Sequence, residues 1–323
     1  MSRYDYSELL MKAATYGSPE KIPVAVGILP AVFMKYGDAV RALIEKYPGL
    51  HFGVDKSYDP TLNMPASYHQ GQFTDPWGCV WSNMAEGMES IVTGHPLPTR
   101  ESVHTMKLPE CDAGLPHGFM YLRLLDLRGF EEMMIDFAEE PPELQLLIDK
   151  VLSYNLTQMH KCIQNCKTKM VYFGDDLGMQ NSLAIGPAKW RKYMKPCFSA
   201  LYKPCLDAGL LVYMHTDGCI WEIMPDLAEC GVDIINPHFR ANGLANLVNT
   251  CKGKIPINLD LDRQLFPFAS AGELRDHVME CITELYLPEG GLGINLEIGP
   301  DVPLDSMDVL FGTLDKAQTY TGS

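Results

Sequence analysis

The 323-residue sequence lacks features that would place it in several common protein classes. No apolar run approaches the roughly 18–20 uninterrupted residues that a membrane-spanning helix needs. The N-terminal residues 1–6 lack the apolar core of a signal peptide. The ten cysteines form no CxxC pair, and a chain of this length then favours free thiols in a reducing compartment over a disulfide framework. Together these absences predict a soluble cytoplasmic protein.

Basic residues and nucleotide-binding motifs are also scarce. The 26 lysines and arginines stand against 41 aspartates and glutamates, which gives a formal net charge of −15. Such a charge disfavours binding to nucleic acid, to anionic membranes and to polyanionic substrates. The sequence contains no GxGxxG fingerprint and no Walker-type loop, so nothing in it indicates a dinucleotide or nucleotide.

Short apolar runs alternate with helical periodicity along most of the chain. This alternation predicts an α/β fold with a parallel sheet. The expected strands lie at residues 22–29, 51–55, 119–125, 170–174, 210–215, 233–236, 255–260 and 292–297. Eight strand–helix units favour a (β/α)₈ TIM-like barrel, and an open doubly wound sheet is the alternative.

Residues 56–118 interrupt this regular pattern. Gly, Pro, Asn and aromatic residues are scattered through the segment without a sustained period. A structureless stretch of this length inside a compact domain is usual only where it serves a function. We therefore expect residues 1–323 to form one barrel domain, with residues 56–118 as a lid of loops, small hairpins and a short helix over the barrel mouth.

Polar residues that can bind a metal follow two of the expected strands. His215 and Asp217 come at the end of Leu210–His215, and Glu297 ends the last strand. The carboxyl ends of barrel strands carry the active site in this fold, so these side chains are candidate metal ligands. Cys219 is a competing ligand. Alternatively, Asp217 serves the turn before the next helix and Glu297 pairs with a lysine.

Further polar and aromatic side chains are expected near the same barrel mouth. Asp175, Asp176 and Asn236 follow other strands and are candidate catalytic residues; an aspartate could equally cap the backbone that follows it. Candidate substrate-binding residues are Trp77, Gln180, Asn181, Tyr213 and His238. Trp77 could instead pack the lid. The histidines of the irregular segment, His95, His104 and His117, are expected mostly at the surface.

Several segments together resemble one family. These are Gly174–Ser182, the helix Pro187–Pro196, His215–Glu222, Gly231–Pro237 and Pro300–Pro303. They resemble the uroporphyrinogen decarboxylase superfamily, which also holds zinc-dependent, corrinoid-linked methyltransferases. The resemblance covers residues 119–318 and implies a (β/α)₈ barrel.

The resemblance favours the methyltransferase branch over the decarboxylases. True decarboxylases carry an arginine-rich N-terminal segment for the substrate carboxylates, whereas Val24–Phe33 contains no arginine. The methyltransferases bind zinc through a His-x-Cys pair and a later cysteine. Their positions here read His215-x-Asp217 and Asn295-Leu-Glu297, so carboxylates replace both thiolates. The resemblance thus implies a zinc site made by His215, Glu297 and either Asp217 or Cys219.

Oxygen ligands leave zinc more electrophilic than thiolates do, which suits polarising a substrate oxygen. We therefore expect a methyltransferase that acts as the O-demethylase component on an aryl methyl ether, and methylated amines or other donors are left open as alternatives. The sequence has no DxHxxG motif of cobalamin-binding modules, so the corrinoid would be carried on a partner protein. The direction of methyl flow is left open. The alternative function is a cofactor-free decarboxylase of another acid, with Asp175 or Asp176 and His215 moving the proton.

Overall fold

The computed structural model describes residues 5–54, 57–110 and 114–322 and has the predicted α/β class. Seven strands belong to one sheet, in the order β2-β1-β10-β9-β8-β7-β6. Their bounds are β1 (Val24–Ile28), β2 (His51–Phe52), β6 (Met170–Gly174), β7 (Leu211–Thr216), β8 (Ile234–Pro237), β9 (Ile257–Asp260) and β10 (Leu292–Ile298). Seven of the eight predicted strands are therefore present in the described part of the chain.

The strand β1, which comes first in the chain, and the strand β10, which comes last, are neighbours in the sheet. β1 pairs with β10 in parallel, with Val24 opposite Ile294 and Ile28 opposite Ile298. β2 continues the sheet on the other side of β1, also in parallel. Adjacent first and last strands are the connectivity of a (β/α)₈ barrel, in which successive strands lie side by side around the sheet. The strand order thus agrees with a TIM-like topology.

The prediction of a strand at residues 119–125 is wrong. This segment enters helix α6 (Tyr121–Arg128), in which Leu124 and Leu127 are buried. A short apolar run fits a buried helix as well as a strand, and periodicity alone does not separate the two. The deciding contact is remote in sequence: the Asp175 carboxylate accepts hydrogen bonds from the backbone N–H groups of residues 120, 121 and 122 and starts the helix.

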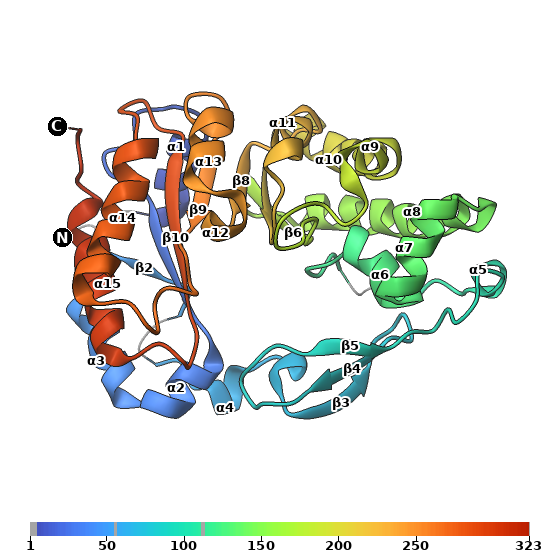
Figure 1. The fold of residues 1–323 in the computed structure, drawn as a ribbon, viewed down its shortest axis with the longest axis horizontal. Coiled ribbons are helices and arrows are strands. Elements are labelled where there is room, and N and C mark those ends of the chain that lie inside the picture. The colour runs from blue at the N-terminus through green and yellow to red at the C-terminus, as the bar shows by residue number, and fades with distance from the viewer. Residues whose placement is uncertain (1–4, 55–56, 111–113, 323) are drawn as a thin grey trace. The chain divides into compact units, whose positions relative to one another are not determined.

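The chain divides into two compact units, and the first comprises residues 1–71, 83–90 and 236–323. Its strands β2, β1, β10 and β9 pack with helices α14 and α15, which lie side by side (Figure 1). The helices of this unit are α1 (Tyr6–Ala14), α2 (Pro30–Tyr36), α3 (Asp38–Lys46), α12 (Phe239–Asn242), α13 (Leu244–Cys251), α14 (Ala271–Leu285) and α15 (Leu304–Ala317). Helix α14 begins with a capping box, in which Ser270 and Glu273 bond each other's backbone N–H.

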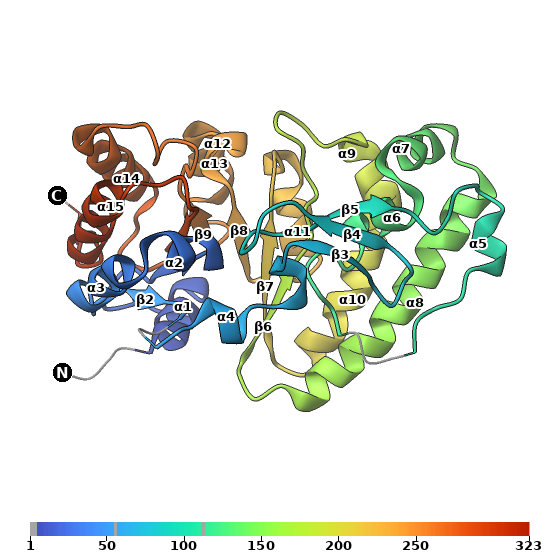
Figure 2. The same cartoon turned by 90° about the horizontal axis from the view of Figure 1, so that it is seen from below.

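The second unit comprises residues 72–82 and 91–235 and contains β6 and β7. Its helices are α6, α7 (Phe130–Glu139), α8 (Pro142–Asn165), α9 (Gly186–Lys189), the π-helix η2 (Trp190–Met194), α10 (Lys195–Asp207), the 3₁₀-helix η3 (Trp221–Ile223) and α11 (Met224–Glu229). Helices α8 and α10 lie side by side (Figure 2). No helix among the described residues is both long and apolar enough to cross a membrane.

The predicted lid contains regular elements. They are α4 (Pro60–Asn63), the 3₁₀-helix η1 (Ala66–Tyr68), β3 (Gly71–Thr74), β4 (Val80–Asn83), β5 (Ile91–Gly94) and α5 (Ser102–Thr105). Strands β3, β4 and β5 form a separate sheet, in which β4 and β5 are antiparallel. The buried Arg123 of α6 bonds Asp75 of the β3–β4 turn at 2.8 Å, so that an ion pair attaches this sheet to α6. Four residues of the expected lid, 56 and 111–113, lie outside the described residues.

Candidate metal centre

Two loops that follow neighbouring strands form the base of the site. β6 and β7 pair in parallel with Gly174 opposite His215, and the loops that follow the two strands lie side by side. Gly178 donates its N–H to the carbonyl of Asp217, and Cys219 donates to that of Met179. A Cβ atom on Gly178 would lie 2.5 Å from the Cys219 nitrogen, and one on Gly218 would lie 2.2 Å from the Gly178 carbonyl. The two loops are therefore in direct backbone contact, which no other residue type allows.

Asp175 joins these loops to helix α6. Its side chain is fully buried, and its carboxylate accepts hydrogen bonds from the N–H groups of Met120 at 3.0 Å, Tyr121 at 2.6 Å and Leu122 at 2.9 Å. Its own N–H donates to the carbonyl of His215. Burial raises the pKa of Asp175 to about 7. The backbone hydrogen bonds stabilise the carboxylate and lower the pKa, but they offset only part of the effect of burial. Asp175, a predicted catalytic residue, therefore uses its carboxylate to cap the start of helix α6.

We expect Asp175→Ala to destabilise the protein by about 2–4 kcal/mol, because it leaves buried N–H groups of α6 without an acceptor. Asp175→Asn keeps one side-chain oxygen as an acceptor and should lose about half as much. Urea unfolding of the three proteins measures the difference. Equal stability of Asp175→Ala and the parent protein would show that the helix start does not depend on this carboxylate.

Contacts with Gly174 hold His117 at the site. Gly118, which follows His117 in the chain, donates its N–H to the carbonyl of Gly174 at 2.8 Å. The His117 ring lies over the bare Cα of Gly174: a Cβ atom there would be 2.3 Å from His117 Cδ2. The end of β6 therefore has room for an imidazole only because it carries a glycine.

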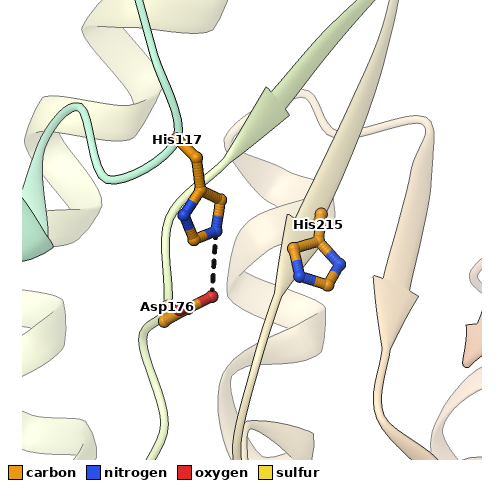
Figure 3. Close-up of side chains that lie close together, drawn as sticks. All are labelled: His117, Asp176 and His215. Carbon is orange, nitrogen blue, oxygen red and sulfur yellow. Dashed lines mark hydrogen bonds and ion pairs between the residues drawn. The ribbon is translucent and has the colours of Figure 1, made fainter. Parts of the chain in front are cut away.

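His117, Asp176 and His215 converge at this place (Figure 3). His117 Nε2 lies 3.1 Å from Asp176 Oδ1, and the two imidazole rings have centroids 5.6 Å apart. One potential ligand atom from each of the three residues lies within 4.8 Å of the other two. Burial lowers the pKa of His117, but the hydrogen bond and the charge of Asp176 outweigh it, so that the pKa is raised overall.

Asp217 extends this group of side chains. Its Oδ1 lies 3.0 Å from His215 Nε2, and its backbone N–H donates to Asp176 Oδ1 at 3.0 Å. Carboxylates commonly orient metal-binding histidines in this way.

The arrangement fits a divalent metal ion. Two ligands that each lie about 2.1 Å from a tetrahedral zinc ion are about 3.4 Å apart, which is close to the separation of His117 Nε2 and Asp176 Oδ1. Two imidazoles and one carboxylate are also an established ligand set for catalytic zinc and for non-haem iron. Three protein ligands would leave the fourth position of a tetrahedral ion for another group.

Glu297 and Cys219, the other predicted ligands, have different surroundings. Glu297 belongs to the first compact unit, where it forms a short ion pair with Arg263. Burial raises the pKa of Glu297, and Arg263 opposes that shift. Cys219 is buried in the second unit, and burial raises the pKa of its thiol, which favours the protonated form that binds metals poorly. Their roles as ligands stay predictions.

The remaining predicted residues belong to both compact units. In the first unit, Asn236 donates to the Asn258 carbonyl at 2.5 Å, and His238 lies 3.4 Å from Asp260. In the second unit, Gln180 and Asn181 are exposed on the loop after β6. Trp77 is buried, edge-on to Tyr154 and near the Arg123 guanidinium. Tyr213 lies on β7, two residues before His215.

The expectation that His117 lies at the surface is confirmed, because 49% of its side chain is exposed, but the sequence did not predict it as a member of the cluster. It lies in the irregular segment, and no periodic pattern surrounds it. The one local hint is that Pro116-His117-Gly118 directly precedes an apolar run, as polar residues next to buried elements often do at binding sites. The contact with Gly174 that gives His117 its place is not visible in the sequence.

Comparisons with known proteins agree with the architecture. A methyltransferase from Methanosarcina mazei superposes with a TM-score of 0.61 at 16% sequence identity, over 95% of this chain and 97% of that chain. No curated protein matches the sequence. The family model for uroporphyrinogen decarboxylase (URO-D) matches residues 124–317, which is more than half of the chain. The chain therefore belongs to the uroporphyrinogen decarboxylase family.

Proposed function

We propose that this protein is a metal-dependent methyltransferase, which moves a methyl group from a small methylated donor to a corrinoid on a separate protein. The observation that supports it most is the convergence of His117, Asp176 and His215 at the ends of β6 and β7. The name of the structural neighbour from Methanosarcina mazei is consistent with methyl transfer. An aryl methyl ether is the donor that we favour.

In this proposal His117, Asp176 and His215 hold a zinc ion, which when bound supplies a Lewis acid for a substrate oxygen. Asp217 keeps the His215 ring in one orientation through the 3.0 Å contact with Nε2. Asp175 acts as a positioning residue, because it fixes the start of α6 and the residue before Asp176. His215 lies on β7, and His117 and Asp176 lie on segments held by backbone contacts to neighbouring strands, so little rearrangement is needed when the ion binds.

A cofactor-free decarboxylase is the second candidate function. The hydrogen bond between His117 Nε2 and Asp176 Oδ1, with His215 adjacent, could also hold and deliver a proton. In that case Asp176 and the histidines, and not the buried Asp175, would act on the substrate. Such an enzyme would not need a metal or a corrinoid.

The test is a reaction of the zinc-loaded protein with 4-methoxyphenol and cob(I)alamin, supplied free or on a corrinoid protein. We expect methylcobalamin, seen by absorbance, and hydroquinone, seen by chromatography, in equal amounts. Removing zinc with a chelator should stop the reaction, and adding zinc should restore it. Carbon dioxide release from a carboxylic acid, at a rate indifferent to zinc and to the corrinoid, would overturn the proposal in favour of the decarboxylase.

A further inference from the structure

Two tyrosines lie on the same face of the β6–β7 pair as the candidate metal centre. Tyr172 is opposite Tyr213 in the strand register, one step of the pleat before Gly174 and His215. Residues two apart on a strand point to the same face, about 6.6 Å from one another. The Tyr172 and Tyr213 rings therefore follow the His117 and His215 rings along this face.

The two tyrosine rings touch, and one of them is open. Their centroids are 5.0 Å apart at an interplanar angle of 45°. Tyr172 is 50% exposed, whereas Tyr213 is 8% exposed. The neighbours on the opposite face, Phe173 and Met214, are buried. The exposed ring of Tyr172 can therefore contact a ligand, while the opposite face of its strand stays packed in the core.

We propose that Tyr172 and Tyr213 bind the aromatic ring of the methyl donor and so select aryl ethers. This inference rests on the proposed function and adds the surface that recognises the donor. The tyrosine pair precedes Gly174 and His215 by two residues, about 6.6 Å along the strands, so in this proposal a donor whose ring lies on Tyr172 presents its ether oxygen to the histidines. Tyr213 supports the Tyr172 ring from its buried side.

The geometry favours a planar ring over a methylated ammonium group. Cages for quaternary ammonium ions enclose the cation with several ring faces. Here the two rings lie against each other, and Tyr172 alone offers a large open surface. A bound divalent ion nearby would also repel a cationic donor, whereas it would attract the phenolate that an aryl ether leaves.

The test compares binding of 4-methoxyphenol with that of its saturated analogue, 4-methoxycyclohexanol, by ligand-observed NMR titration of the full chain. We expect the aromatic ligand to bind about 2- to 10-fold more tightly to the parent protein, as stacked aromatic pairs do. Tyr172→Leu keeps an apolar side chain and should bring the ratio close to one. The matched control is Phe268→Leu, which removes the aromatic ring of a residue that is 89% exposed in the first unit and should leave the ratio unchanged.

A ratio near one in the parent protein, or an unchanged ratio in Tyr172→Leu, would overturn the inference. Tyr213→Leu is the second variant, and it should lower the ratio less than Tyr172→Leu does. The binding ratio does not require turnover. A preserved ratio without methyl transfer would therefore contradict the proposed function alone, and methyl transfer with a ratio near one would contradict the ring site alone.

Discussion

His215→Ala is expected to lose its metal ion and its methyl transfer together. His215 is one of three groups whose ligand atoms lie within 4.8 Å of one another. Disturbing even the supporting partner of a metal ligand costs about 10- to 100-fold in affinity, so removal of the ligand itself should cost more than about 100-fold. The fold should persist, because His215 lies at the end of a strand and not in the core. Metal content after dialysis and circular dichroism measure the two effects.

Three further variants separate the possible ligand sets. Asp176→Ala should behave like His215→Ala, and His104→Ala, which removes an exposed histidine next to Glu143, should retain the metal. Glu297→Gln is the decisive comparison, because Glu297 is a predicted ligand that forms an ion pair with Arg263. Metal loss in Glu297→Gln together with retention in Asp176→Ala would contradict the cluster of His117, Asp176 and His215.

Gly174→Ala should weaken metal binding by about 10- to 100-fold without touching a ligand. The new Cβ atom would lie 2.3 Å from His117 Cδ2, so the imidazole has to move away from Asp176. The φ angle of Gly174 is not in the left-handed region, so that the effect comes from the contact and not from backbone strain. Isothermal titration of the metal-free protein with zinc measures the affinity.

A double-mutant cycle shows whether this effect passes through His117. In a His117→Ala background, Gly174→Ala should have almost no further effect, since the ring that it displaces is gone. Gly272→Ala is the control, because its nearest atom would be Ser270 Oγ at 3.9 Å, and alanine favours the helix there. Additive losses in the double mutant would mean that Gly174 acts on the site by another route.

The fold was largely predictable because most of its elements have strong local patterns. β6 has the predicted bounds. Residues 119–125 were not predictable, since Phe119 to Leu125 is apolar enough for either a strand or a buried helix. The acceptor that starts α6 belongs to Asp175, about 50 residues later in the chain.

Two of the three residues of the candidate centre were visible in the sequence for the same reason. Asp176 and His215 follow recognisable strands of an α/β fold, so their neighbourhood could be expected. His117 could not, because its position depends on the space above Gly174. The ion pair between Glu297 and Arg263 also depends on a loop after β9 whose course no periodicity describes.

The contact between Gly178 and Gly218 has a consequence for how relatives of this protein can diverge. Neither loop can gain a side chain at this point, or change its length before it, unless the other loop moves as well. The two loops should therefore change together in evolution. Replacing one of them with the loop of a relative should prevent correct folding, whereas replacing both should not. If the proposed function holds, we expect variation in donor choice at positions beyond the contact, such as the exposed Gln180 and Asn181.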